Sequence, residues 1–221
     1  MAGMTGRRKT AAGRWRAFYS RGMEIGGCPL SDFAVRIIAQ QYNSGMRILD
    51  AGCGSGRGIR HLLATYSARR EAIDIAGLDF CMEALQLQHE HSAEICGDMF
   101  SLPFKPECFD MVIARQVLEG YSSDDISRLS DGFFKVLRNG GNLILDARGP
   151  MDSRAAGTGS SLCCGSSTNS FFSRNELIRC FASFTAVDWE EDFRCRKTPS
   201  GERLITHTVS MLLRKDSSGR E

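Results

Sequence analysis

A glycine-rich segment that follows a short apolar run has the clearest potential for ligand binding. It reads Arg47-Ile-Leu-Asp-Ala-Gly-Cys-Gly-Ser-Gly-Arg-Gly58, and its glycines permit a sharp turn that brings a ligand against main-chain N–H groups. The dinucleotide pattern G-x-G-x-x-G is not met, because its last position falls on Arg57 or Ile59. Asp50 would repel a phosphate but suits a ligand that bears an ammonium and a sulfonium. The segment therefore predicts a nucleotide-like ligand without a pyrophosphate, bound at the carboxyl end of a strand.

Apolar runs and helical patterns alternate along most of the chain, which is typical of βαβ crossovers and a parallel sheet. A helix is expected from Ser31 to Gly45, and a capping box at Ser173 begins a later one. Strands are expected at 46–50, 72–79, 94–97, 109–114 and 142–147, and a terminal antiparallel hairpin at 184–193 and 204–213. We therefore expect an α/β fold: a doubly wound, mostly parallel seven-stranded sheet with helices on both faces and a C-terminal antiparallel hairpin.

The composition is that of a folded globular protein. Of the 221 residues, 42% are hydrophobic and 24% are charged, and a net charge of +2 gives no field that demands a nucleic acid. The nine cysteines include no C-x-x-C pair, so the spacing supports neither a disulfide framework nor a zinc site. No uncharged apolar run reaches the roughly 18 residues that cross a bilayer. We expect a cytoplasmic protein with no membrane contact and no metal.

One domain is expected from 31 to 215, flanked by two short terminal segments. Residues 1–30 are predicted to form a loose tail and then an aromatic cover segment, and 216–221 a disordered tail. The basic start of the chain fits a frayed terminus, an organelle transit peptide or an arm that touches phosphate. Residues 149–170 are predicted to form a flexible loop. Its cysteine pair 163–164 could bind a soft metalloid or consist of inert thiols.

In their order, the motifs resemble those of the class I S-adenosylmethionine-dependent methyltransferases, especially the small ubiquinone and menaquinone methyltransferase-like members. The glycine-rich segment is similar to their first motif, Gly77-Leu-Asp79 to the acidic end of their second strand, and Gly97-Asp98 to the pair after their third. Three further segments agree: 102–104, 109–113 and 136–145. The resemblance covers about residues 40–148. It implies a Rossmann-like methyltransferase fold, S-adenosyl-L-methionine as the cofactor and S-adenosyl-L-homocysteine as the product.

The resemblance also implies roles for single residues. Asp79 would accept hydrogen bonds from both ribose hydroxyls, and Phe80 would pack on the adenine. Asp98 would accept from the adenine amine, with Met99 as an apolar neighbour of the ring. Both aspartates have an alternative role as caps of the elements that follow, and Asp50 either contacts the ligand or only organises its loop. Four backbones would border the methionine moiety: Gly52, Cys53, Gly54 and Ala114.

Residues for the methyl acceptor follow less directly, because displacement at a sulfonium needs alignment more than it needs a catalytic motif. Where many relatives carry a histidine, this chain has Arg115-Gln-Val-Leu-Glu-Gly120, so the resemblance assigns no catalytic residue. None of the four histidines is chosen. Glu119 and Asp146 are candidate bases, with a solvated charge and a strand-end cap as their alternatives. The candidates for contact with the acceptor are Trp15, Tyr19, Gln116 and Arg148.

Three functions compete at this point. The leading one is an enzyme that moves a methyl group from S-adenosylmethionine to a small or medium-sized molecule. The second is a non-catalytic S-adenosylmethionine-binding subunit or regulator with the same fold, because a fold alone does not establish an activity. The third, a nicotinamide oxidoreductase, is disfavoured by Arg57. The expected partner is a small-molecule methyl acceptor and not a nucleic acid, and the oligomeric state stays open.

Overall fold

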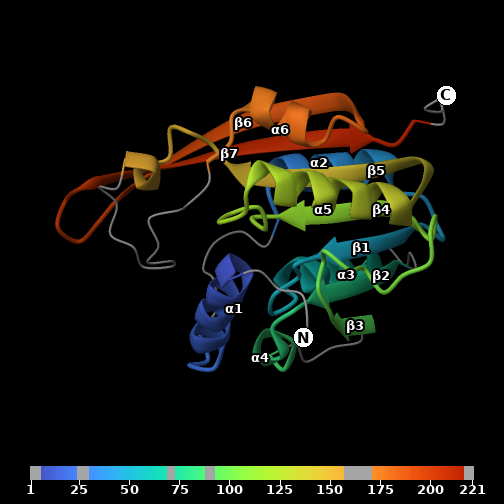
Figure 1. Ribbon diagram of the computed structural model, residues 1–221, viewed down its shortest axis with the longest axis horizontal. Coiled ribbons are helices and arrows are strands. Elements are labelled where there is room, and N and C mark those ends of the chain that lie inside the picture. Colours follow the sequence, from blue (N-terminus) through green and yellow to red (C-terminus); the bar gives the residue numbers. More distant parts are fainter. Residues whose placement is uncertain (1–5, 24–29, 69–72, 88–92, 157–170, 217–221) are drawn as a thin grey trace.

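A computed structural model describes residues 6–23, 30–68, 73–87, 93–156 and 171–216. They form one seven-stranded sheet in the order β3-β2-β1-β4-β5-β7-β6 (Figure 1). The strands are β1 (Arg47–Ala51), β2 (Asp74–Asp79), β3 (Ala93–Cys96), β4 (Phe109–Arg115), β5 (Leu137–Arg148), β6 (Thr185–Lys197) and β7 (Arg203–Arg214). The helices are α1 (Gly6–Tyr19), α2 (Asp32–Gln41), α3 (Arg57–Ala68), α4 (Met82–Leu85), α5 (Ser123–Val136), α6 (Arg174–Cys180) and the 3₁₀ turn η1 (Ser153–Ala156).

The pairing of the strands confirms the expected fold class. Strands β1 to β5 pair in parallel, whereas β7 runs antiparallel to both β5 and β6. The carboxyl ends of the parallel strands therefore meet at one edge, which is the end of the sheet that α1 lies beside in Figure 1. Connections that return through helices place the loops that follow β1, β2, β3 and β4 at this same edge.

Two hydrophobic cores cover the two faces of the sheet. On one face, α5 and α6 bury Phe133 and Leu177 against alternate residues of the central strands. On the other face, α2 and α3 pack over the strand residues Ile48 and Ile113. The central strand β4 is fully buried from Met111 to Ala114, which explains why the sequence of that strand shows no alternation.

Local capping interactions begin two helices where the sequence predicts them. The Ser31 hydroxyl accepts a hydrogen bond from the Ala34 N–H at 3.1 Å and begins α2. Ser173 and Glu176 form the reciprocal capping box of α6, with Glu176 accepting from the Ser173 N–H at 2.8 Å. The predicted end of the first of these helices at Gly45 is wrong, because α2 ends at Gln41 and the next residue is already extended.

Residues Gly6–Tyr19 form a helix, where the sequence predicted a loose tail and the start of a cover segment. α1 packs against α4 through its last turn, where Trp15, Phe18 and Tyr19 contact Cys81 and Ala84. This tertiary contact stabilises a basic helix that has no apolar stripe along its length. The rest of the predicted cover segment, residues 24–29, lies outside the described residues.

The first part of the predicted flexible loop, residues 149–156, is folded onto β7. Asp152 is buried and pairs with Arg154, and the Ser153 hydroxyl accepts from the Ile205 N–H at 2.7 Å. The Met151 N–H donates to Nδ1 of His207 at 3.1 Å. Residues 157–170, which include the cysteine pair, and residues 217–221 lie outside the described part of the chain.

This ordered segment predicts the effect of adding one methyl group at Gly149. A Cβ there would lie 2.2 Å from Nδ1 of His207, whose ring is buried and stacks on Phe193 at 4.2 Å. We expect Gly149→Ala to lower the free energy of unfolding by about 1–3 kcal/mol, as overpacking does, when measured by urea denaturation. Gly13→Ala is the control, since a Cβ at Gly13 meets nothing within 4 Å. Equal stability of Gly149→Ala and the parent would contradict the packing described here.

Candidate functional site

The glycine loop between β1 and α3 lies at the carboxyl edge of the sheet. Gly52, Gly54 and Gly56 have φ angles of +80°, +56° and +71°, a region that only glycine adopts without strain. A Cβ at Gly52 would lie 2.4 Å from Cγ1 of Val117, and a Cβ at Gly54 would lie 2.7 Å from the Tyr19 hydroxyl oxygen. The loop is therefore enclosed by the segment after β4 on one side and by α1 on the other.

The main-chain N–H groups of this loop are already engaged within the protein. The N–H groups of Gly52 and Cys53 donate to the Leu78 carbonyl oxygen at 2.7 and 3.2 Å, and the Gly54 N–H donates to Oδ2 of Asp79 at 2.9 Å. The expectation that a ligand would lie against these N–H groups is therefore wrong for residues 52–54. The N–H groups of residues 52–54 are therefore not open to an anion.

Asp79 joins the ends of β1 and β2. Its Oδ2 atom accepts from Gly54, its Oδ1 atom accepts from the Cys81 N–H at 2.8 Å, and the residue is only 8% exposed. Burial raises the pKa of Asp79, and the N–H hydrogen bonds oppose that rise. The capping role is real, but each carboxylate oxygen keeps a second lone pair. Asp79 can therefore hold the loop and still accept two ligand hydroxyls.

Asp50 is the second buried carboxyl group at this edge. Burial raises its pKa to about 6; the Arg115 guanidinium works against this rise, and the nearby Asp79 carboxylate adds to it. Asp50 pairs with Gly77 of β2 on one side and with Ile113 of β4 on the other, so it lies in the centre of the sheet, near the end of β1. Two carboxyl groups at one strand edge produce a negative potential, which favours a cationic ligand.

The end of β3 contributes Asp98 and Met99. Oδ1 of Asp98 accepts from the Phe100 N–H at 3.0 Å and organises a turn, which is the capping alternative, while its other oxygen keeps acceptor capacity. Met99 is buried, and its Cε atom would lie 3.8 Å from a Cβ at Gly52. The Gly97 N–H donates to the Asp79 carbonyl oxygen at 3.0 Å, which brings the β2 and β3 ends together.

Aromatic side chains of α1 close the other side of this edge. The Trp15 and Tyr19 rings stack with centroids 5.9 Å apart, and Phe18 meets Tyr19 edge-on at 5.2 Å. Phe80, which directly follows β2, packs with the same cluster. The structure thus brings the α1 candidates next to the glycine loop and next to the residue expected to contact the adenine.

A polar group follows β4 and β5 at the same edge. Gln116 has a φ of +54°, which is unusual for a non-glycine residue, and its Oε1 atom accepts from Nε of Arg148 at 3.1 Å. Arg148 Nε also lies 3.5 Å from Oε1 of Glu119. That buried carboxylate oxygen has no hydrogen-bond partner among the residues that the structure describes. Burial raises the pKa of Glu119, and Arg148 works against this.

Asp146 is engaged in holding the scaffold. Its Oδ2 atom pairs with Nε of Arg115 at 2.7 Å, and its Oδ1 atom accepts from the Ser31 hydroxyl at 3.3 Å. Because both oxygens are engaged and the side chain is only 1% exposed, Asp146 is not accessible to an acceptor. Ala114 is fully buried in β4 between β1 and β5, so only its backbone remains as a candidate for ligand contact.

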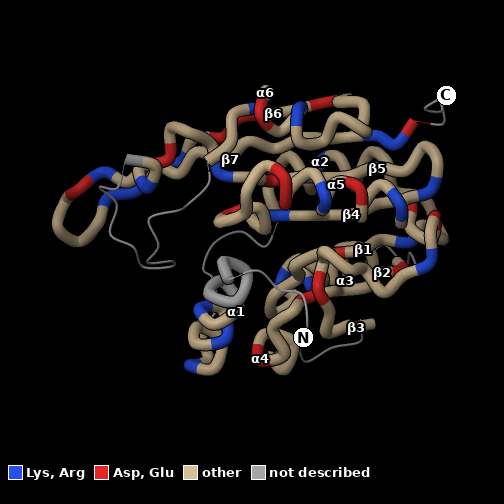
Figure 2. Tube along the Cα trace, viewed as in Figure 1, with Lys and Arg blue, Asp and Glu red and all other residues tan. Residues whose placement is uncertain are grey.

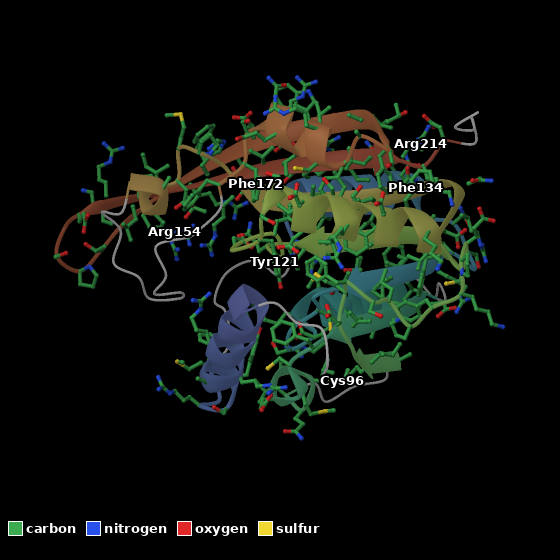
Figure 3. All side chains as sticks on the ribbon, in the orientation of Figure 1. Cys96, Tyr121, Phe134, Arg154, Phe172 and Arg214 are labelled. Atoms are coloured by element: carbon green, nitrogen blue, oxygen red, sulfur yellow. The ribbon has the colours of Figure 1, made fainter. Side chains whose placement is uncertain are left out.

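Three neighbours of the site were not singled out from the sequence: Val117, Arg115 and Arg154. Val117 encloses Gly52, Arg115 acts on the Asp50 carboxyl, and Arg154 lies within electrostatic reach of Glu119. Figure 3 shows Arg154 and Tyr121 at the same end of the sheet as α1. No sequence pattern marks these residues, because each acts through a contact that the tertiary fold creates. Within the described residues no group of side chains fits a metal ion, and no helix is long and apolar enough to cross a membrane.

Comparison with known proteins places this arrangement in a family. A family model described as a methyltransferase domain matches residues 49–145. The mitochondrial ubiquinone biosynthesis O-methyltransferase of Rattus norvegicus is 28% identical over 113 residues, which cover 46% of this chain and 30% of that protein. Residues 49–145 therefore form a domain of the S-adenosylmethionine-dependent methyltransferase family. S-adenosylmethionine is the cofactor of this family.

Other members of the family differ in what their names say they methylate. The phthiotriol/phenolphthiotriol dimycocerosates methyltransferase of Mycobacterium leprae is 36% identical over 109 residues, which cover 48% of this chain and 39% of that protein. The human "Probable tRNA methyltransferase 9B" is 28% identical over 114 residues, covering 50% of this chain and 23% of that protein. This chain thus spans well under half the length of these three relatives.

Solved structures of methyltransferases confirm the fold. The S-adenosylmethionine-dependent methyltransferase of Anabaena variabilis superposes with a TM-score of 0.70 at 13% identity and covers 96% of both chains. That of Methanosarcina mazei gives a TM-score of 0.63 at 18% identity and covers 82% of this chain and 98% of its own.

The role of Asp79 predicts a loss of cofactor affinity on truncation. We expect Asp79→Ala to weaken binding of S-adenosylhomocysteine by about 1.5–3 kcal/mol, because hydrogen bonds to a charged group are lost. Isothermal titration calorimetry measures this. Asp74→Ala is the matched control, because Asp74 begins the same strand and its side chain is 61% exposed. Unchanged affinity in Asp79→Ala would contradict the ribose role.

The pKa of Asp50 predicts a pH dependence of binding. A cationic ligand favours the ionised carboxylate, so affinity for S-adenosylmethionine should fall as the pH falls through about 6, and binding near that pH should release a proton. Calorimetry in buffers of different ionisation enthalpy detects that proton, and Asp50→Asn should abolish its release. A binding heat that does not depend on the buffer in the parent protein would show that ligand binding does not change the ionisation of Asp50.

Proposed function

We propose that this chain is an enzyme that transfers the methyl group of S-adenosylmethionine to a small or medium-sized acceptor by in-line displacement. The observation that carries the proposal is the pair of buried carboxyl groups, Asp50 and Asp79, beside a glycine loop whose N–H groups at residues 52–54 are bonded within the protein. These carboxylate acceptors suit hydroxyl and ammonium groups, which donate hydrogen bonds, and disfavour phosphates.

The residues present fit the cofactor. Asp79 has free lone pairs for two ribose hydroxyls, and Asp98 has a carboxylate oxygen for the adenine amine. Phe80 and Met99 provide apolar surfaces for the ring at the ends of β2 and β3. The backbone of residues 52–54 would border the methionine moiety, with Asp50 at the end of the preceding strand for its ammonium.

The segment after β4 and the end of β5 would bind the acceptor. When bound, the cofactor supplies an activated methyl group with a neutral thioether as leaving group. The protein then needs to align the acceptor, exclude water and, where the nucleophile is protonated, take up a proton. Glu119 fits the last task, because its Oε1 atom has no hydrogen-bond donor in the described structure and burial raises its pKa. Arg148 and Gln116 would hold Glu119 in place.

The acceptor class is part of the proposal. The relatives named above include enzymes for ubiquinone biosynthesis and a tRNA methyltransferase, so family membership leaves the acceptor open. A small molecule is supported by the net charge of only +2 and by the carboxyl groups at this edge, which would repel an RNA backbone. These groups are Asp50, Asp79, Asp98 and Glu119. We include a cytoplasmic location in the proposal, because the cysteines of the described residues are free thiols.

Transfer of a labelled methyl group tests the activity. The protein and Asp79→Ala are incubated with methyl-labelled S-adenosylmethionine and, separately, a metabolite extract or total RNA. We expect label in the small-molecule fraction with the parent protein only. Cofactor binding by calorimetry without transfer to either fraction would favour the non-catalytic alternative, and label in RNA would overturn the acceptor class.

Glu119 predicts a defect confined to the methyl-transfer step. With the acceptor found by labelling, Glu119→Gln should lower kcat by about 10²–10⁴-fold, the range for loss of a general base, and leave the affinity for S-adenosylhomocysteine unchanged. Glu202→Gln, in the exposed turn before β7, is the control. An unchanged kcat in Glu119→Gln would show that this carboxylate only balances the Arg148 charge.

A further inference from the structure

Strand β6 is a long and exposed edge of the sheet. It forms one end of the strand order and pairs only with β7 among the described strands. Trp189 and Phe193 on this strand are 43% and 53% exposed, which is unusual for large aromatic side chains. A long edge strand with exposed apolar residues is a template for pairing with another strand.

The backbone of β6 presents hydrogen-bonding groups to the outside. On β7, the N–H groups of Ile205 and His207 point away from β6, because they donate to Ser153 and Asp152. The residues between them therefore make the bonds to β6, where the even-numbered positions 192, 194 and 196 face them. The odd-numbered positions 191, 193 and 195 then direct their N–H and C=O groups outward, away from every described strand.

The charges of β6 are arranged symmetrically around Phe193. The acidic residues Glu190 and Asp192 lie before it, and the basic residues Arg194 and Arg196 lie at equal distances after it. These four side chains share one face of the strand. Figure 2 shows that acidic and basic residues are both present along the β6–β7 hairpin. A strand with this arrangement is complementary to an antiparallel copy of itself.

We propose that β6 pairs with β6 of a second copy in an antiparallel, two-fold symmetric dimer whose axis passes through Phe193. In this register Asp192 faces Arg194 of the second copy, and Glu190 faces its Arg196. Residues 191, 193 and 195 become the hydrogen-bonded pairs, which matches the outward direction of their backbone groups. The two sheets then form one continuous sheet.

Electrostatics selects this register over its neighbours. A shift of the axis to Asp192 or to Arg194 would place two like charges directly opposite each other, which is destabilising. The charged positions also fall on the non-hydrogen-bonded pairs, where facing side chains are closest. Within one chain, Arg194 already contacts Asp192 at 2.6 Å and Asp32 at 3.2 Å, and Arg36 contacts Asp188 and Glu190. In the proposed dimer, the ion pairs between the two copies set the register. The backbone hydrogen bonds between the two β6 strands and the burial of Phe193 provide the stabilisation.

Removal of one outward donor tests the dimer without disturbing the chain's own sheet. In Cys195→Pro the lost N–H points outward, so the ladder to β7 stays intact, whereas Cys195→Ala keeps the N–H and is the matched control. We expect sedimentation equilibrium to show a dimer for the parent and for Cys195→Ala. Dimerisation of Cys195→Pro should be weaker by about tenfold or more, because two symmetric hydrogen bonds are lost.

Charge inversion tests the register. Asp192→Arg and Arg194→Asp should each weaken the dimer, and the double variant should restore it, because it again places opposite charges face to face. Arg128→Asp combined with Asp131→Arg, on the exposed face of α5, is the control for charge change alone. A parent protein that stays monomeric, or equal dimerisation of Cys195→Pro and Cys195→Ala, would overturn the proposal. Weak dimers for all three β6 charge variants would overturn the register.

Discussion

The candidate site depends on one buried carboxylate, that of Asp79. A charged group at 8% exposure is costly unless it is hydrogen-bonded, and here the N–H groups of Gly54 and Cys81 supply that compensation. The same two bonds fix the glycine loop after β1 to the turn after β2. The shape of the loop and the ionisation of the carboxylate are therefore coupled, and a ligand that adds donors to Asp79 would stabilise both.

Two further carboxyl groups near the strand ends, those of Asp50 and Glu119, are also largely buried. Burial raises the pKa of Asp50 and of Glu119, so the protein keeps two carboxyl groups in an environment that disfavours their ionised forms. Such groups are characteristic of functional sites, because a bound cation or a proton donor relieves the cost. In the proposed site, Asp50 lies on the cofactor side and Glu119 on the acceptor side. The strained backbone at Gln116 lies in the segment between them along the chain.

Sequence patterns predicted the elements that are specified locally or by burial alone. The uninterrupted apolar run of β4 and the capping box at Ser173 correspond to the structure because each depends on its own residues. Helix α1 was missed because its stability comes from aromatic contacts with α4 and not from its own basic sequence. The engaged N–H groups of the glycine loop and the unpartnered oxygen of Glu119 could not be predicted, because both depend on distant segments that the fold brings together.

A crystal structure of the protein with S-adenosylhomocysteine tests the central claim most directly. The account predicts that both ribose hydroxyls lie within hydrogen-bond distance of the Asp79 carboxylate, while Gly54 and Cys81 keep their bonds to it. It also predicts that the ammonium group lies near Asp50 and that the sulfur faces the segment from Gln116 to Glu119. A ligand whose ribose is bound elsewhere, with Asp79 contacting only Gly54 and Cys81, would contradict it.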